Sequence, residues 1–171
     1  MAEASVRLSA EHLAEAEFAR FGRVIARPDR NADASGPGWR WWGETLALPA
    51  DDRRYCVGLL DLAPAEPRFD WAERHMRSVE AIVPVGGDCL VYVGPPDALD
   101  EPGALPPLDA FRVFRVPQGR GVVLDKGVWH GAPLAAGAPL HALVLLLEGT
   151  GRADTTVVRF EHNPVSIAMN L

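Results

Sequence analysis

Short segments of alternating or continuous apolar residues follow one another along most of the chain. Apolar and polar residues alternate over Phe69–His75 and Val79–Val85, whereas Cys89–Val93 is apolar throughout. Because neighbouring side chains of a strand point to opposite faces, alternation predicts half-buried strands and a continuous run predicts a strand buried on both faces. Turn residues separate about ten such segments, a pattern typical of an all-β sandwich or barrel. The other expected strands are Val24–Ala26, Trp39–Leu48, Tyr55–Leu62, Phe111–Val116, Gly121–Leu124, Leu140–Leu147 and Thr156–Phe160.

One segment near the start has the spacing of a helix instead. Apolar residues recur every three or four positions between Ala10 and Phe21. Ser9 is expected to cap this helix and Gly22 to end it. The chain of 171 residues fits one domain with one core. We expect residues 1–171 to form it, with a helix at about 10–21, a barrel at about 23–162 and a tail at 163–171 that packs on the barrel or on a second subunit.

Composition excludes several classes of function. The net charge is −6 and no basic run is present, so nucleic-acid binding is not expected. No Gly-rich loop links a strand to a helix, so no nucleotide cofactor is expected. The start lacks a leader pattern and the longest apolar run, Ala142–Leu147, is too short to span a bilayer, so we expect a cytoplasmic protein with no membrane segment. Cys56 and Cys89 are interpreted as buried free thiols, with a catalytic thiolate or a disulfide as alternatives.

Two segments carry residues suited to chemistry. The first contains Glu73, His75 and Glu80; residues two apart share one face of a strand, so Glu73 and His75 can point into one pocket with Glu80 facing them. The second runs from Gly119 to His130 and is expected to form a hairpin that delivers His130. Imidazole and carboxylate groups suit a divalent metal such as zinc, nickel, iron or manganese. A hydrogen-bonded polar cluster without metal is the alternative.

These spacings resemble the two motifs of the cupin superfamily. The first cupin motif reads H-x-H, three or four residues, E, six residues, G, and here Glu73, His75, Glu80 and Gly87 occupy its positions. The second reads G, five residues, P-x-G-x-x-H, and the chain has Gly119, Asp125, Gly127 and His130 there. The resemblance implies an all-β, double-stranded β-helix (jelly-roll) barrel. Glu73 replaces the first histidine and Asp125 the proline, so a site with two histidines and two carboxylates is expected.

A closer resemblance is to the ureidoglycolate lyase family of small cupins. Three pieces carry it: Glu73-Arg74-His75, Ala81-Ile82-Val83-Pro84, and Gly127-Val128-Trp129-His130. The resemblance implies cleavage of ureidoglycolate to glyoxylate and urea during purine (allantoin) degradation, a homodimer, and assistance by a metal such as nickel, manganese or zinc. Glu80 stands where the family usually has glutamine. The family has polar residues where this chain has Val123, Leu124 and Leu147, and an arginine where it has Glu148. The apolar residues at the first three positions favour a less polar substrate.

Roles in this reaction are assigned as hypotheses. Glu80 or His130 is the candidate base, and Glu73 the candidate acid or substrate contact. Arg40 or Lys126 is the candidate for holding a substrate carboxylate, and Lys126 is also a candidate catalytic acid. Arg40 stacked on a neighbouring tryptophan and Lys126 as a solvated turn residue are the alternatives. Trp129 is a further candidate substrate contact. His12 and His162 are interpreted as surface residues, and His141 as a structural residue.

Two other functions fit the same pattern. A cupin can carry out lyase, isomerase or oxygenase chemistry with a metal on another small hydroxy or keto acid, because a fold does not decide a function. A cupin can also bind a small molecule without turning it over. Turnover of a substrate panel separates the first alternative from the lyase, and binding without turnover or metal supports the second.

Overall fold

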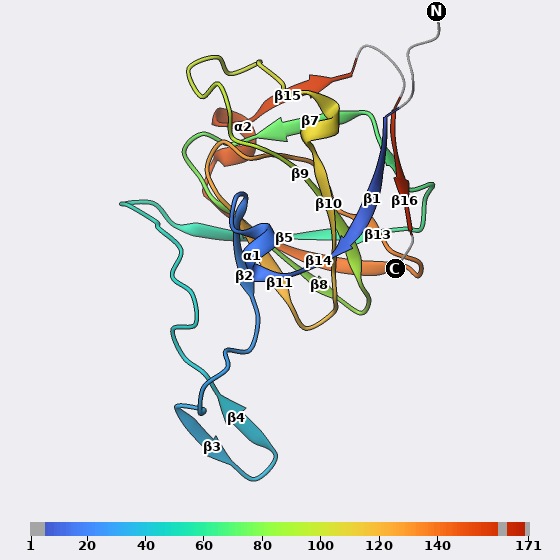
Figure 1. Ribbon diagram of the computed structural model, residues 1–171. Helices are drawn as coiled ribbons and strands as arrows, with labels where there is room; N and C mark the ends of the chain where they lie inside the picture. The colour runs from blue at the N-terminus through green and yellow to red at the C-terminus, as the bar shows by residue number, and fades with distance from the viewer. Residues whose placement is uncertain (1–5, 161–163, 170–171) are drawn as a thin grey trace, which may run out of the picture.

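The computed structural model describes residues 6–160 and 164–169, which form two curled sheets and a small separate hairpin (Figure 1). The nine-stranded sheet has the order β15 (Thr156–Arg159), β7 (Trp71–Arg74), β12 (Trp129–His130), β9 (Cys89–Gly94), β10 (Arg112–Val116), β1 (Arg7–His12), β16 (Val165–Ala168), β6 (Arg68–Phe69), with β13 (Leu134–Ala135) also paired to β9. The five-stranded sheet has the order β2 (Gly22–Ile25), β11 (Gly121–Leu124), β8 (Glu80–Val85), β14 (Leu140–Leu147), β5 (Tyr55–Leu62). The hairpin pairs β3 (Ala34–Gly36) with β4 (Trp39–Trp41).

Helices contribute little to the described residues. They are α1 (Glu15–Phe18), α2 (Thr150–Ala153) and a 3₁₀ turn at Leu108–Ala110. None of them is long and apolar enough to cross a membrane. The expected all-β barrel of cupin type is confirmed.

Strand β9 shows why a continuous apolar run marks the centre of this fold. Its odd residues, such as Val91, pack into the core between the two sheets together with Phe114. Its even residues, such as Tyr92, pack into a second core on the opposite face together with Trp129. All six residues of β9 are buried. The nine-stranded sheet is therefore covered on both faces around β9, and this strand forms a firm base for β12 beside it.

The prediction of a helix between Ala10 and Phe21 is wrong. Residues Arg7–His12 form β1, which pairs in parallel with both β10 and β16, and only Glu15–Phe18 is helical. Ser9 lies in β1 opposite Ala168 and caps nothing. Backbone bonds to two neighbouring strands outweigh the local helical spacing, because a strand between two partners satisfies nearly all its polar groups. The spacing did identify buried residues, since Phe18 and Phe21 lie in the core.

Two further expectations change in part. The extended segment Trp39–Leu48 contains only three strand residues, Trp39–Trp41. Cys89 is a buried free thiol as expected. Cys56 is exposed instead, because β5 is the edge strand of the five-stranded sheet and no other described strand lies on its outer side. In the tail, Val165–Ala168 forms β16 between β1 and β6, so the expectation that the tail packs on the barrel is confirmed for these residues.

Candidate active site

Strands from both sheets bring four polar side chains together. In the β7–β12 pair, Glu73 lies directly opposite His130. His75 follows the end of β7, and Glu80 is the first residue of β8 in the other sheet. Side chains paired across adjacent strands lie close on one face of the sheet. The group therefore bridges the space between the two sheets.

Glycines in the turn before β12 determine where His130 lies. Gly127 has a φ of +80°, a backbone conformation that side chains disfavour, and its N–H donates to the His75 carbonyl at 2.7 Å. Directly after His130, a Cβ on Gly131 would lie 1.6 Å from the Tyr92 hydroxyl. The turn thus ties the His130 segment to the backbone of His75. The expected hairpin does not form, because β11 pairs with β2 and β8 whereas β12 pairs with β7 and β9 in the other sheet.

The two imidazoles share one carboxylate oxygen. Nε2 of His75 lies 3.1 Å from Oε2 of Glu80, and Nε2 of His130 lies 3.0 Å from the same atom. The Nδ1 atoms face backbone carbonyls instead, of Asp154 at 2.9 Å and of Val128 at 2.9 Å. Because a carbonyl only accepts hydrogen bonds, each Nδ1 carries a hydrogen, which leaves the Nε2 lone pair of a neutral ring facing a carboxylate. That arrangement calls for a proton or a cation between them.

Burial and charge shift the pKa values of this cluster in opposite directions. His75, Glu80 and His130 are all buried. Burial raises the pKa of the Glu80 carboxyl, but the charge of His130 and hydrogen bonds from both histidines outweigh it and lower that pKa to about 2. For His130, burial lowers the pKa, and the charge and hydrogen bond of Glu80 raise it more, so the net shift is upward. Glu80 is therefore ionised at neutral pH.

These side chains fit a divalent metal. The ligand atoms of Glu73, His75 and His130 all lie within 4.8 Å of one another, and Glu80 contacts both imidazoles. Two Nε2 lone pairs directed at one point, with carboxylate oxygens beside them, form a donor set that suits zinc, nickel or manganese. The hydrogen bonds from Nδ1 to carbonyls are the kind of support that orients histidine ligands.

A pocket of about 310 Å³ opens over the cluster. Glu73, His75, Glu80 and Thr155 form its polar part. The rest is mostly apolar and comes from β5, β14 and the loops beside them: Gly58, Leu59, Leu60, Ala132, Val144, Leu146 and Gly151. A small polar molecule can thus reach the carboxylates beside an apolar wall.

Comparison with known proteins identifies the family. The family model described as ureidoglycolate lyase matches residues 5–168. The chain belongs to the ureidoglycolate lyase family. It is 30% identical over 149 residues to a ureidoglycolate lyase of Azotobacter vinelandii, covering 84% of this chain and 87% of the relative. It is also 30% identical over 124 residues to ureidoglycolate lyase 2 of Rhizobium meliloti, covering 70% of this chain and 72% of the relative.

Three other site candidates of this family member lie outside its pocket. Lys126 is exposed in the turn before β12 and is not part of the pocket lining. Arg40 lies in β4, on a hairpin that extends away from the barrel (Figure 1). Trp129 is fully buried in the second core and stacks against the guanidinium of Arg74 at 4.6 Å, so it does not contact substrate. It alternates with His130 along β12 and therefore points to the opposite face.

The apolar departures from the family pattern do not line the pocket. Val123, Leu124 and Leu147 are buried at 0–1% exposure, and none belongs to the pocket lining. Leu124 packs in the core between the two sheets, Val123 packs with Val79 and Ala81, and Leu147 is buried, so these three positions give no support to a less polar substrate. Glu148 is exposed and pairs with Arg54 at 2.9 Å.

Some residues that shape the site had no signal in the sequence. Asp154 holds the segment after β7, because its carbonyl accepts from His75 and its carboxylate accepts from the N–H groups of Met76 and Arg77. Thr155 contacts His75 Nδ1 at 3.2 Å. Both lie almost eighty positions from His75, and no local pattern links them.

The remaining histidines match their interpretation where the structure describes them. His12 is exposed. His141 is exposed as well and pairs with Asp61 at 2.5 Å between β14 and β5. His162 lies outside the described residues.

Proposed function

We propose that the protein cleaves ureidoglycolate into glyoxylate and urea, as a carbon–nitrogen lyase of the amidine-lyase type. The observation that carries this proposal is the cluster of Glu73, His75, Glu80 and His130, of which the first three line one pocket and the fourth contacts Glu80 behind it, in a chain of this family. The relatives at 30% identity bear the name of this activity. A cytoplasmic location and a role in purine nitrogen recovery stay predictions from the sequence.

The reaction needs little beyond a proton transfer and the stabilisation of charge. Ureidoglycolate is a hemiaminal, so its central carbon carries a hydroxyl, a carboxylate and the urea nitrogen. As the carbon–nitrogen bond breaks, the hydroxyl proton leaves, the carbon–oxygen bond becomes a carbonyl, and the departing urea nitrogen gains a proton. No water is consumed, which suits a pocket with an apolar wall.

His75, His130 and Glu80 are the residues that would hold a divalent metal, with Glu73 beside them and with nickel, manganese and zinc as candidates. When bound, the metal would supply a Lewis acid beside the substrate oxygens. Glu80 keeps its charge because its pKa is about 2, and it holds both imidazoles in place. A carboxylate with so low a pKa is a weak base, so Glu80 serves as a charge partner.

Glu73 is the residue to which we assign the proton transfer. It lines the pocket, is only half-buried, and its carboxylate has no hydrogen-bond partner among residues 6–160 and 164–169. One oxygen of Glu73 accepts the hydroxyl proton and returns it to the urea nitrogen. The apolar side chains of Leu60, Val144 and Leu146 line the same pocket and limit access of water.

Glyoxylate release from racemic ureidoglycolate tests the proposal. The purified protein is assayed as isolated, after chelation, and with nickel, manganese or zinc added back. We expect release that chelation abolishes and one metal restores. We also expect His130→Ala to lose turnover and to stay folded, with His12→Ala, at an exposed position, as the matched control.

Three outcomes would change the proposal. Release that chelation does not affect keeps the lyase and removes the metal. Full activity in His130→Ala removes the assigned site. No release from folded, metal-loaded protein overturns the lyase and directs the search to other small hydroxy and keto acids.

A further inference from the structure

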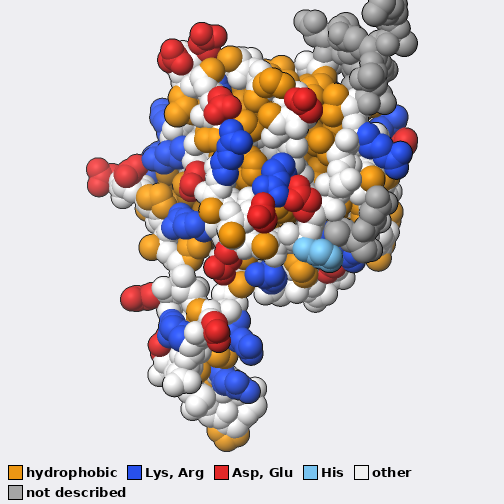
Figure 2. Space-filling view, in the orientation of Figure 1, with side chains coloured by type: hydrophobic (Ala, Val, Ile, Leu, Met, Phe, Trp, Pro, Cys, Tyr) orange, Lys and Arg blue, Asp and Glu red, His pale blue; other side chains and the backbone are white. Residues whose placement is uncertain are grey.

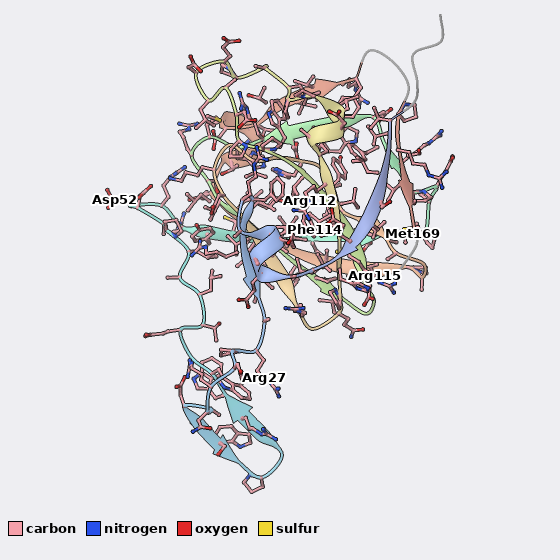
Figure 3. The ribbon with its side chains drawn as sticks, viewed as in Figure 1. Arg27, Asp52, Arg112, Phe114, Arg115 and Met169 are labelled. Atoms are coloured by element: carbon pink, nitrogen blue, oxygen red, sulfur yellow. The ribbon has the colours of Figure 1, made fainter. Side chains whose placement is uncertain are left out.

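The β3–β4 hairpin and its flanks, residues 27–44, form an arm that leaves the body of the protein (Figure 1). Figure 2 shows the arm as a narrow projection with basic side chains on its surface. Arg27 lies where the chain leaves the barrel, and Asp52 lies just before it rejoins the barrel at β5 (Figure 3). None of the three described core clusters includes a residue of the arm.

The arm is an ordered structure in spite of its isolation. Asp33 accepts from the Gly43 N–H at 2.8 Å and pairs with Arg30 at 2.5 Å. Arg30 also donates to the Gly43 carbonyl at 3.0 Å, and the indole of Trp42 donates to the Arg30 carbonyl at 2.9 Å. An isolated two-stranded hairpin is marginally stable in water. A built hairpin without a core of its own therefore calls for a surface to pack on.

The side chains at the tip of the arm are those of a contact surface. Trp39 is 54% exposed and Trp41 is 61% exposed, with Arg40 exposed between them. Tryptophan and arginine are the side chains most enriched at the energetic centres of protein interfaces. Two largely exposed tryptophans on one short strand are costly in water, so the tip is expected to be covered.

A matching uncovered surface lies at the mouth of the pocket. Strand β5 ends the five-stranded sheet, so one of its edges has no partner strand among residues 6–160 and 164–169. Val57 is 68% exposed and Leu59 is 65% exposed. Gly58, Leu59 and Leu60 of the same strand also line the pocket. A long apolar edge strand of this kind is normally covered, and whatever covers β5 lies beside the pocket.

The pocket also lacks a group that its substrate needs. No lysine or arginine occurs among its lining residues, all of which belong to the described part of the chain. The substrate class proposed above carries a carboxylate, and arginine binds carboxylates through paired hydrogen bonds. The Arg40 side chain makes no hydrogen bond or ion pair with the described residues, and no lysine or arginine lines the chain's own pocket.

We propose that the arm of one copy of this chain docks on β5 of a second copy and supplies Arg40 to the pocket there. Trp39 and Trp41 cover Val57 and Leu59, and Arg40 binds the substrate carboxylate. Each copy has both an arm and an open β5, so one two-fold axis satisfies both contacts at once. The role of Arg40 rests on the proposed function, whereas the docking of the arm does not.

Hydrodynamics and thiol labelling test the docking without any substrate. We expect the wild-type protein to sediment as a dimer, and a variant with residues 30–43 replaced by a short Gly-Ser linker to sediment as a monomer. The double variant Trp39→Ser, Trp41→Ser should also sediment as a monomer, although the backbone of its arm is unchanged. Cys56, which is exposed on β5, should react with a maleimide about tenfold more slowly in the dimer. A wild-type monomer, or equal labelling in all three proteins, overturns the docking.

Mixed dimers test the role of Arg40. Arg40→Ala is expected to lower kcat/KM by about 10–100-fold, since a charge-assisted pair is lost. Arg68→Ala, at another exposed arginine, is the control and should keep full activity. Arg40→Ala and His130→Ala chains carrying different tags are then co-expressed, and heterodimers are isolated on both tags. Each heterodimer has one complete pocket if Arg40 acts across the interface, so about half of the wild-type activity is expected.

The outcomes separate this inference from the proposed function. Inactive heterodimers beside an active wild type show that Arg40 does not act across the interface. Full activity of Arg40→Ala itself removes Arg40 from the site. A wild type that does not cleave ureidoglycolate refutes the proposed function, while sedimentation and Cys56 labelling still decide the docking.

Discussion

Glu73 and His130 lie directly opposite each other across the β7–β12 pair, one as an unbonded carboxylate and the other as an anchored imidazole. The Nδ1 of His130 is bonded to the Val128 carbonyl, and its Nε2 is bonded to Glu80. Glu73 is half-buried in the pocket wall. Glu73 is therefore free to move a proton, whereas His130 is fixed in the orientation that a metal ligand needs.

Replacing Glu73 by glutamine tests this difference between the two residues. We expect Glu73→Gln to lower kcat by about 100-fold or more, because removal of a positioned proton carrier typically costs 10²–10⁴-fold. Nickel, manganese or zinc affinity should fall by less than about tenfold, since the imidazoles and Glu80 are unchanged. Steady-state kinetics and competition with a fluorescent chelator measure the two effects.

Glu66→Gln is a suitable control, because this exposed residue forms a surface ion pair with Arg68, away from the pocket. Unchanged kcat in Glu73→Gln would contradict the assignment. Loss of the metal together with activity would mean that Glu73 is needed mainly as a ligand.

In the metal-free protein, the Glu80–His130 pair predicts a pH-dependent stability. The pKa of His130 is raised above its ordinary 6.5, so its stabilising contribution is present below 6.5 and is lost as pH rises through the folded value. The pKa of Glu80 is lowered from 4.5 to about 2, so its contribution is present above 4.5 and is lost as pH falls toward 2. Both contributions are complete between pH 4.5 and 6.5.

Glu80→Gln should therefore destabilise the chelated protein most within this window and less in alkaline buffer, where His130 is neutral. Urea unfolding of both proteins at each pH measures the difference in the free energy of unfolding. A difference that is constant with pH would show that the pair is not an ion pair. Asp61→Asn, at an exposed residue paired with His141, serves as the control for a surface pair.

Most strands and the centre of the site could be predicted from local patterns. Alternation marked β7 and β8, the apolar run marked β9, and the spacing of Glu73, His75, Glu80 and His130 identified side chains that the fold brings together. These features are local in the sequence, because the face of a strand depends on parity and a turn depends on nearby glycines.

The predictions that failed concern features that depend on contacts with residues distant in the sequence. The segment Arg7–His12 becomes a strand only because β10 and β16 lie on either side of it. The sequence predicts Trp129 as a substrate contact, yet parity along β12 directs its side chain to the opposite face from His130. Asp154 supports His75 from almost eighty residues away, and a single sequence carries no signal of that contact.

The two cysteines predict a clear difference in reactivity. Burial raises the pKa of the Cys89 thiol to about 12, whereas Cys56 is exposed on β5. Since the thiolate is the reactive form, Cys56→Ser should give folded protein that a thiol reagent does not label at neutral pH. Cys89→Ser should give protein that still labels once per chain. Labelling of folded Cys56→Ser at a rate faster than global unfolding would contradict the burial of Cys89.

The contacts of Arg74, the central residue of the Glu73-Arg74-His75 motif, predict that its role is structural. Its side chain is fully buried, and its guanidinium donates to the backbone carbonyls of Asp97, Ala98, Glu101 and Pro102. It also covers the ring of Trp129, whose indole nitrogen has no hydrogen-bond partner among the described residues. One side chain therefore fixes the loop after β9 against the strand that carries His130.

Arg74→Lys keeps the charge but loses the planar fork of donors, so it leaves buried carbonyls unpaired. We expect it to lower the free energy of unfolding by about 2–4 kcal/mol, measured by urea denaturation. Arg68→Lys, at an arginine that is 55% exposed, should change stability by less than about 0.5 kcal/mol. Metal affinity of folded Arg74→Lys should stay within about threefold of wild type, because Arg74 contacts none of the four donor side chains. A variant with wild-type stability and lost turnover would instead place Arg74 in the chemistry.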